Sequence, residues 1–111
     1  MADSDSLIIV TTTVADRPTA DQLARSLVES CHAACVQIVP EISSTYYWQG
    51  EMCVEAECLL LIKTLASKYA ELEAELRSLH PYDEPEIVAI AASAVSQSYL
   101  QWAIDALARQ K

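Results

Sequence analysis

The spacing of apolar residues changes along the chain, and each change marks a boundary between predicted elements. Leu7–Val10 is a continuous apolar run that Thr11–Thr13 extend. Its β-branched residues predict a strand covered on both faces. Apolar residues at 20, 23, 24, 27, 28 and 31 then recur at helical spacing and predict a helix over 18–31. Thr19 and Gln22 have the spacing of a capping box at the start of this helix.

Residues 34–63 predict two long strands joined by a tight turn. Pro40 has no N–H to give to a ladder, so it marks a bend, a bulge or an edge in the first arm. Gly50 is the only glycine in the chain, and we expect it at the hairpin tip with a positive φ. In the return arm, 51–63, acidic residues on one face give way to leucines. This strand is therefore expected to begin solvated on one face and to end buried on both.

The last third of the chain predicts a helix over 65–79, a doubly buried strand over 87–92 and a helix over 97–109 that Ser96 or Ser98 caps. The complete order is β-α-β-β-α-β-α, with an extra helix at the C-terminus. We therefore predict an α+β, ferredoxin-like split β-α-β fold in a single domain, 1–111. Its antiparallel sheet would carry both main helices on one face and a long central hairpin.

Composition narrows the classes of function. The net charge is −9, which disfavours binding to nucleic acid or to an anionic membrane. The N-terminus lacks a basic segment followed by an apolar core, and no apolar run has the length of a membrane span. Together with four cysteines this predicts a cytoplasmic protein with reduced thiols. The low charged fraction, 21%, hints at apolar surface hidden against another subunit.

Candidate catalytic and metal-binding residues are few. The cysteines lack the C-x-x-C spacing that is typical of a zinc site. Cys31, Cys35 and Cys58 are therefore expected in the core, where cysteine is a common small residue. Cys53 is expected to be more exposed. Only His32 and His80 could serve as imidazole bases, and no glycine-rich loop cradles a phosphate. We therefore predict that the protein is not an enzyme.

The loop 80–86 is the best candidate for metal binding. It places His80 beside three carboxylates, Asp83, Glu84 and Glu86, a donor set that suits zinc, nickel or Cu(II). The alternative is a turn made rigid by Pro81 and Pro85, with solvated charges. We expect any metal binding to be weak.

Tyr46, Tyr47 and Trp48 lie near the end of the predicted hairpin and are expected at a subunit contact. The 13 residues of the return arm would span about 43 Å. A domain of this size has a radius of gyration of only about 13 Å. The hairpin should therefore extend past its own helices and dock on a neighbouring copy. Lys63 is expected to reach solvent or to pair with an acid, for which Glu86 is a candidate.

The sequence resembles the CutA family of divalent-cation tolerance proteins. The resemblance rests on five blocks in the family's order, which cover nearly the whole chain: Ala33–Ile38, Tyr46–Glu51, Leu60–Thr64, His80–Ile87 and Tyr99–Trp102. It implies a ferredoxin-like subunit, a homotrimer and an association with tolerance of copper or other divalent ions. It also implies a shape similar to the PII signalling proteins, which bind small effectors between subunits.

The resemblance also implies positions for functional residues. The residues that we expect at a subunit interface or cleft all fall within the five blocks: Tyr46, Tyr47, Trp48, Lys63, Tyr82, Glu86 and Trp102. Copper ligands proposed for bacterial members are a thiol at the end of the first strand and two adjacent histidines. Here Thr12 and Leu79 stand at two of those positions, so metal binding carries over to His80 alone. Three classes stay open: a metal-responsive trimer, a PII-like sensor of a small molecule or protein, and an enzyme.

Overall fold

The computed structural model describes residues 5–109, which form a four-stranded antiparallel sheet and three α-helices. The elements in chain order are β1 (Leu7–Val14), α1 (Arg17–Glu29), β2 (Cys35–Trp48), β3 (Glu51–Leu65), the short 3₁₀ helix η2 (Ala66–Lys68), α2 (Tyr69–Leu79), β4 (Val88–Ala91) and α3 (Gln97–Ala108). The strand order is β2-β3-β1-β4. This confirms the predicted α+β ferredoxin-like fold.

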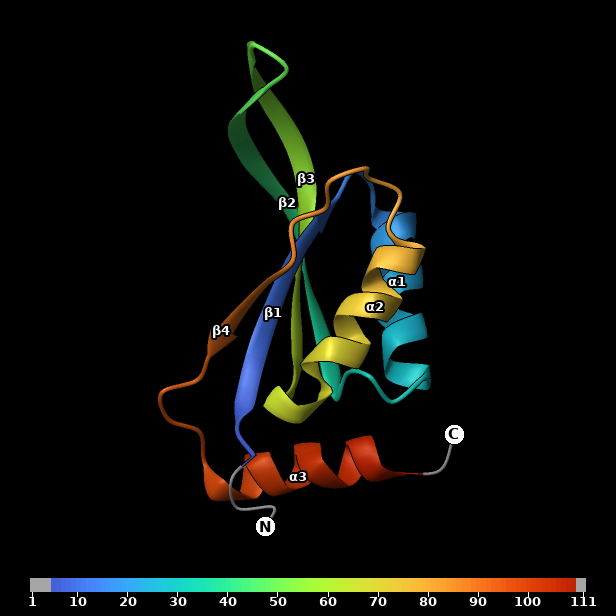
Figure 1. Ribbon diagram of the computed structural model, residues 1–111, viewed down its shortest axis with the longest axis vertical. Coiled ribbons are helices and arrows are strands. Elements are labelled where there is room, and N and C mark those ends of the chain that lie inside the picture. The colour runs from blue at the N-terminus through green and yellow to red at the C-terminus, as the bar shows by residue number, and fades with distance from the viewer. Residues whose placement is uncertain (1–4, 110–111) are drawn as a thin grey trace.

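Two apolar clusters hold the sheet to its helices. Helices α1 and α2 lie side by side on one face, while α3 crosses the opposite end from the hairpin tip (Figure 1). Val10, Val14 and Leu60 on the sheet are fully buried against Leu27 of α1 and Leu72 of α2, within one core cluster. A smaller cluster joins α3 to the ends of β1, β2 and β3 and contains Leu7, Ala34, Leu65, Ala103 and Leu107. None of the helices in the described range is long and apolar enough to cross a membrane.

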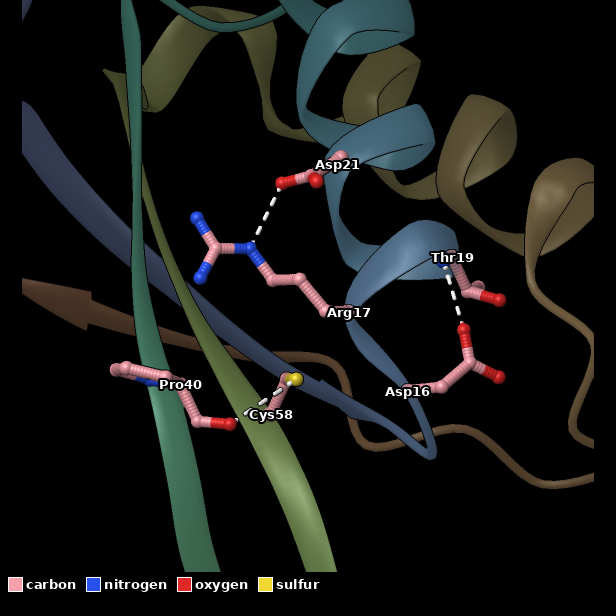
Figure 2. Close-up of polar contacts among 6 residues, drawn as sticks. All are labelled: Asp16, Arg17, Thr19, Asp21, Pro40 and Cys58. Carbon is pink, nitrogen blue, oxygen red and sulfur yellow. Dashed lines mark hydrogen bonds and ion pairs between the residues drawn. The ribbon is translucent and has the colours of Figure 1, made fainter.

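The start of α1 differs from the predicted capping box. Asp16, not Thr19, is the N-cap, and its carboxylate accepts a hydrogen bond from the Thr19 backbone N–H at 2.8 Å (Figure 2). This bond holds the pKa of Asp16 below its usual range. Arg17 and Pro18 then occupy the first turn, where proline is tolerated because its missing N–H has no helical partner. The prediction was wrong because the helix begins earlier than a Thr19 cap would allow. Arg17 and Pro18 already belong to its first turn, so the cap is Asp16.

The boundary between β3 and α2 also lies later than predicted. Leu65, predicted as the first residue of the helix, is the last residue of β3 and is buried. The 3₁₀ turn Ala66–Lys68 then leads into α2. Asp5 stabilises this turn, because its carboxylate accepts hydrogen bonds from the Ser67 N–H and hydroxyl.

The β2–β3 hairpin carries the bulge and the turn that its sequence predicts. The pairing shifts between Val39 and Ile42, so Pro40 lies at a bulge on an edge strand, as expected. The Pro40 carbonyl, freed from the ladder, accepts a hydrogen bond from the Cys58 thiol at 3.3 Å (Figure 2). At the tip, Gln49 and Gly50 have φ values of 52° and 83°, the pattern of a type I′ hairpin turn. The tip projects well beyond the helices (Figure 1).

The prediction that 87–92 forms a doubly buried strand was wrong for this chain. β4 is a short edge strand that pairs only with β1, and all four of its residues are exposed. Val88 and Ile90 keep about half of their surface in contact with solvent, at 50% and 52%. The physical reason is that α3 covers the sheet only near Leu7 and Leu65, and leaves the rest of that face open.

Candidate functional site

The alternation of side chains divides the projecting hairpin into two chemically different faces. Tyr46 pairs with Cys53, and Tyr47 pairs with Met52. Because neighbouring residues of a strand point to opposite faces, Tyr46 and Trp48 share one face while Tyr47 occupies the other. The predicted aromatic cluster is therefore split between two surfaces.

The face that bears Tyr47 is apolar and open to solvent. Tyr47, Met52 and Val54 are 70%, 71% and 65% exposed, and the register places them together beyond the end of α1 and α2. Large apolar side chains gathered on one projecting surface are typical of contacts between proteins.

The opposite face forms one wall of a cleft of about 740 Å³. The second wall is the loop between α2 and β4, and the end of β1 closes the floor. The lining residues are Thr13, Ala15, Ser44, Thr45, Tyr46, Trp48, Glu55, Ala56, Glu57, Tyr82, Asp83, Glu84 and Glu86. The lining contains five carboxylates and three aromatic rings but no basic side chain. It therefore suits a cation better than an anion.

Glu57 is the most enclosed carboxylate of the cleft. It is only 9% exposed, and its Oε2 accepts a hydrogen bond of 2.7 Å from the Tyr82 hydroxyl. Burial, and then the hydrogen bond to Glu57, raise the pKa of Tyr82, so the phenol stays protonated and remains a donor. Burial and the nearby Glu55 likewise raise the pKa of Tyr46.

His80 lies behind this cleft and not in its lining. Its Nε2 lies 2.9 Å from the Thr13 carbonyl, and its Nδ1 accepts a hydrogen bond from the Tyr82 N–H at 3.1 Å. The neutral ring with its proton on Nε2 satisfies both contacts. Burial lowers the pKa of His80, which favours the same neutral form. The ring also packs against Tyr82, with 4.8 Å between ring centroids.

The donors near His80 do not form a dedicated copper site. Among residues 5–109, no group of three histidines, cysteines or acids lies close enough together to hold a metal ion. Thr12 is fully buried and Leu79 is 41% exposed, and neither can replace a thiolate or imidazole ligand. Cys31 and Cys58 are buried as expected, whereas Cys35, also expected in the core, is only partly buried, as is Cys53.

Glu86, the candidate acidic partner of Lys63, forms no ion pair with it among the described residues. Lys63 Nζ instead lies 5.5 Å from the centre of the Tyr99 ring. Glu86 accepts a hydrogen bond of 2.7 Å from the Thr11 hydroxyl. Trp102 stacks on Tyr99 near Lys63, with ring centroids 5.5 Å apart.

The residues predicted for an interface or cleft therefore fall on three surfaces. The cleft brings together Tyr46, Trp48, Tyr82 and Glu86. Lys63 and Trp102 lie around Tyr99 at α3, and Tyr47 lies on the apolar hairpin face.

Sequence reasoning missed Glu57 and Thr13 as site residues. The alternation in β3 marked Glu57 as solvated, but the loop that carries Tyr82 folds back over it. The sequence did offer one signal for the burial of Glu57, because this carboxylate lies next to the buried apolar part of its strand. Nothing in the local sequence identifies Tyr82 as its partner.

His32, the other imidazole, lies on a different surface. Its Nδ1 is 2.8 Å from the Ser30 hydroxyl, and its Nε2 is 3.9 Å from a carboxylate oxygen of Glu71. None of these three residues lines the cleft at the hairpin or the shallow hollow beside α1 that is lined by Asp21, Arg25 and Val36. A catalytic constellation would need room for a substrate beside the hydroxyl.

Comparison with known proteins identifies one family. Residues 8–106 match the family described as CutA1 divalent ion tolerance protein. The divalent-cation tolerance protein CutA of Thermus thermophilus is 43% identical over 85% of this chain and 91% of its own length. The chloroplastic protein CutA of Arabidopsis thaliana is 41% identical over 86% of this chain, which spans only 52% of that relative. The crystal structure of divalent ion tolerance protein CutA1 from Ehrlichia chaffeensis superposes with a TM-score of 0.90, at 27% identity over 95% of this chain and 98% of that one.

Proposed function

The chain belongs to the CutA1 divalent ion tolerance family, and from this premise we propose that it acts in copper tolerance or response as a cytoplasmic homotrimer, without catalysing a reaction. Family membership carries the association with divalent ions. The open apolar surfaces of the chain support self-association. The net charge of −9 supports the absence of nucleic-acid and membrane partners.

Self-association is supported by two apolar surfaces that are exposed to solvent in a single chain. One is the hairpin face of Tyr47, Met52 and Val54, and the other is the edge strand with Val88 and Ile90. A two-stranded ribbon is marginally stable in water, and an unpaired edge strand invites pairing. Docking the hairpin of one copy on the sheet of the next would cover both surfaces, and cyclic closure would leave no copy unpartnered. The resemblance to CutA proteins favours three subunits over two.

Native mass spectrometry at micromolar concentration tests the assembly. We expect a trimer for the unmodified protein and smaller species for a Met52→Lys/Val54→Lys variant, because two charges would enter a desolvated contact. Ala70→Lys, on the exposed surface of α2, is the control and should remain trimeric. A stable monomer of the unmodified protein would refute the proposal, and a dimer would refute only the number of subunits.

Direct metal binding is the weaker part of the proposed function. His80 is the main ligand in this proposal, and binding is weak because a metal must displace one of the two hydrogen bonds of the ring. Affinity should peak at Cu(II) among the first-row divalent ions.

Calorimetry with Cu(II) separates His80 from other ligands. We expect weak binding that falls further in His80→Asn and is little changed in His32→Asn, the matched control. Tight binding that survives His80→Asn would contradict the assignment and would direct attention to the cysteines.

The cleft favours a second candidate function, that of a PII-like sensor for a small molecule. Its volume of about 740 Å³ is within the usual range for small-molecule sites, and aromatic side chains alternate with polar groups along its walls. Thermal-shift measurements without turnover would support a sensor, whereas turnover lost on substitution of His80 would support an enzyme.

A further inference from the structure

The cleft contains two groups whose interactions are incomplete. Thr13 is 6% exposed and belongs to the cleft lining, and none of the hydrogen bonds within residues 5–109 involves its hydroxyl, although the fully enclosed hydroxyl without a partner there is that of Thr12. Glu57 is 9% exposed and accepts a hydrogen bond from Tyr82, but no basic side chain of the described residues pairs with it. A buried carboxylate without a counter-charge is costly, so a bound cation would stabilise it.

The carboxylates are arranged for an extended cation and not for a metal ion. Glu55 and Glu57 lie on the hairpin wall, and Asp83, Glu84 and Glu86 lie on the loop wall. These acids are too dispersed to form a group of three that could hold one metal ion. Charges on two facing walls match a ligand whose positive groups are separated by several bonds.

The aromatic residues complete the chemistry of the ligand. Tyr46, Tyr82 and Trp48 line the same cleft, and Tyr46 and Trp48 are about half exposed toward it, at 42% and 47%. Aromatic faces attract ammonium groups and also pack against methylene chains. A ligand that joins ammonium groups by methylene segments would contact both the carboxylates and the aromatic side chains of the lining.

We propose that the cleft binds a linear polyamine. The Glu57 carboxylate and the Thr13 hydroxyl would accept hydrogen bonds from one ammonium group at the floor. The loop acids would bind a second ammonium group, and Tyr46 and Trp48 would cover the methylene chain. This inference rests on the sensor alternative above, and it names the class of effector.

Spermidine is the probe, and Trp48 is the reporter. The chain has two tryptophans, so Trp102→Phe leaves Trp48 as the only indole. In this background we expect spermidine to quench or shift the fluorescence of Trp48. The change should saturate near one spermidine molecule per cleft. Sodium and magnesium salts at the same ionic strength should give no saturable change, because simple screening does not fill the cleft.

Two carboxylate variants decide whether the cleft is responsible. Glu57→Gln should weaken spermidine binding by about tenfold or more, because it removes the most buried charge. Glu71→Gln makes the same change of net charge on the exposed face of α2, and should alter affinity by less than about twofold. Far-UV circular dichroism verifies that both variants fold.

The results that would refute the polyamine assignment differ from those that would refute the proposed assembly or the sensor function. No saturable binding, equal binding of Mg²⁺, or equal loss in both variants would each overturn the polyamine assignment. A trimer with no spermidine response would leave the proposed assembly intact and overturn the polyamine assignment alone. Binding of an uncharged molecule that Glu57→Gln does not affect would support a sensor and refute this effector class.

Discussion

The two halves of β3 show how one strand can serve two purposes. From Cys58 to Leu65 it pairs with β1, and over residues 59–63 also with β2 on its other side, and its residues are buried or half-buried. From Glu51 to Ala56 it pairs with β2 alone, and all its residues but Cys53 are exposed. The inner half derives its stability from this chain's own helices. The outer half has no such support, so its apolar residues must be explained by something outside the chain.

The largest effect should separate the two halves directly. Leu60→Ala removes a fully buried side chain from the inner half and should reduce the free energy of unfolding by about 2–5 kcal/mol. Val54→Ala, in the exposed outer half, should change it by less than about 0.5 kcal/mol in dilute, dissociated protein. Denaturant unfolding at several concentrations is the measurement. A large cost for Val54→Ala that grows with protein concentration would show that assembly buries the outer half, whereas a large cost in the monomer would contradict the comparison.

The boundary between the halves depends on Tyr82. Tyr82→Phe leaves the buried Glu57 carboxylate without its donor and should cost about 1–3 kcal/mol. Tyr47→Phe removes a hydroxyl from the exposed hairpin face and should be nearly neutral. A double-mutant cycle with Glu57→Leu sharpens the measurement, since the cost of Tyr82→Phe should shrink when no carboxylate is present. An unchanged cost would mean that Tyr82 stabilises the loop by packing alone.

His80 should make the free energy of unfolding depend on pH. Its pKa in the folded state lies below the ordinary value of 6.5, mainly because it is buried. The unfolded chain therefore takes up the proton first as pH falls, and stability is lost from about pH 6.5 downward. The loss is about 1.4 kcal/mol for each unit by which the pKa is lowered. Unfolding titrations between pH 7.5 and 5.5 should show a shallower dependence for His80→Asn, and an unchanged slope would refute this account.

The smallest effect should come from the hairpin tip. Gly50→Ala places a Cβ at φ 83°, where nothing lies within 4 Å, so the cost is conformational and not steric. It should be about 1 kcal/mol, with a smaller cost for Gly50→Asn, because asparagine tolerates a left-handed backbone. Thermal unfolding of both variants provides the comparison. Equal effects of alanine and asparagine would indicate that the turn changes type.

The sequence predicted most of the fold because the period of its apolar residues follows the elements. The bulge at Pro40 and the tip at Gly50 were predictable, since each rests on the chemistry of one residue. The burial of β4 was not predictable, because an apolar run does not reveal whether its cover comes from the same chain. The cleft was predicted only in part. Glu57 meets Tyr82 across 25 positions and Thr11 meets Glu86 across 75, and neither partner has a local signal.

The bulge at Pro40 also constrains how the hairpin can vary in length. It inserts one extra residue into β2, so odd positions before it and even positions after it point to the same face. As long as the bulge is kept, deleting a single residue of β2 between the bulge and the turn would exchange the faces of that arm, placing Tyr47 in the acidic cleft and Trp48 on the apolar surface. Changes of length in this segment should therefore preserve both faces when each arm gains or loses two residues, because one residue on each arm also exchanges the faces.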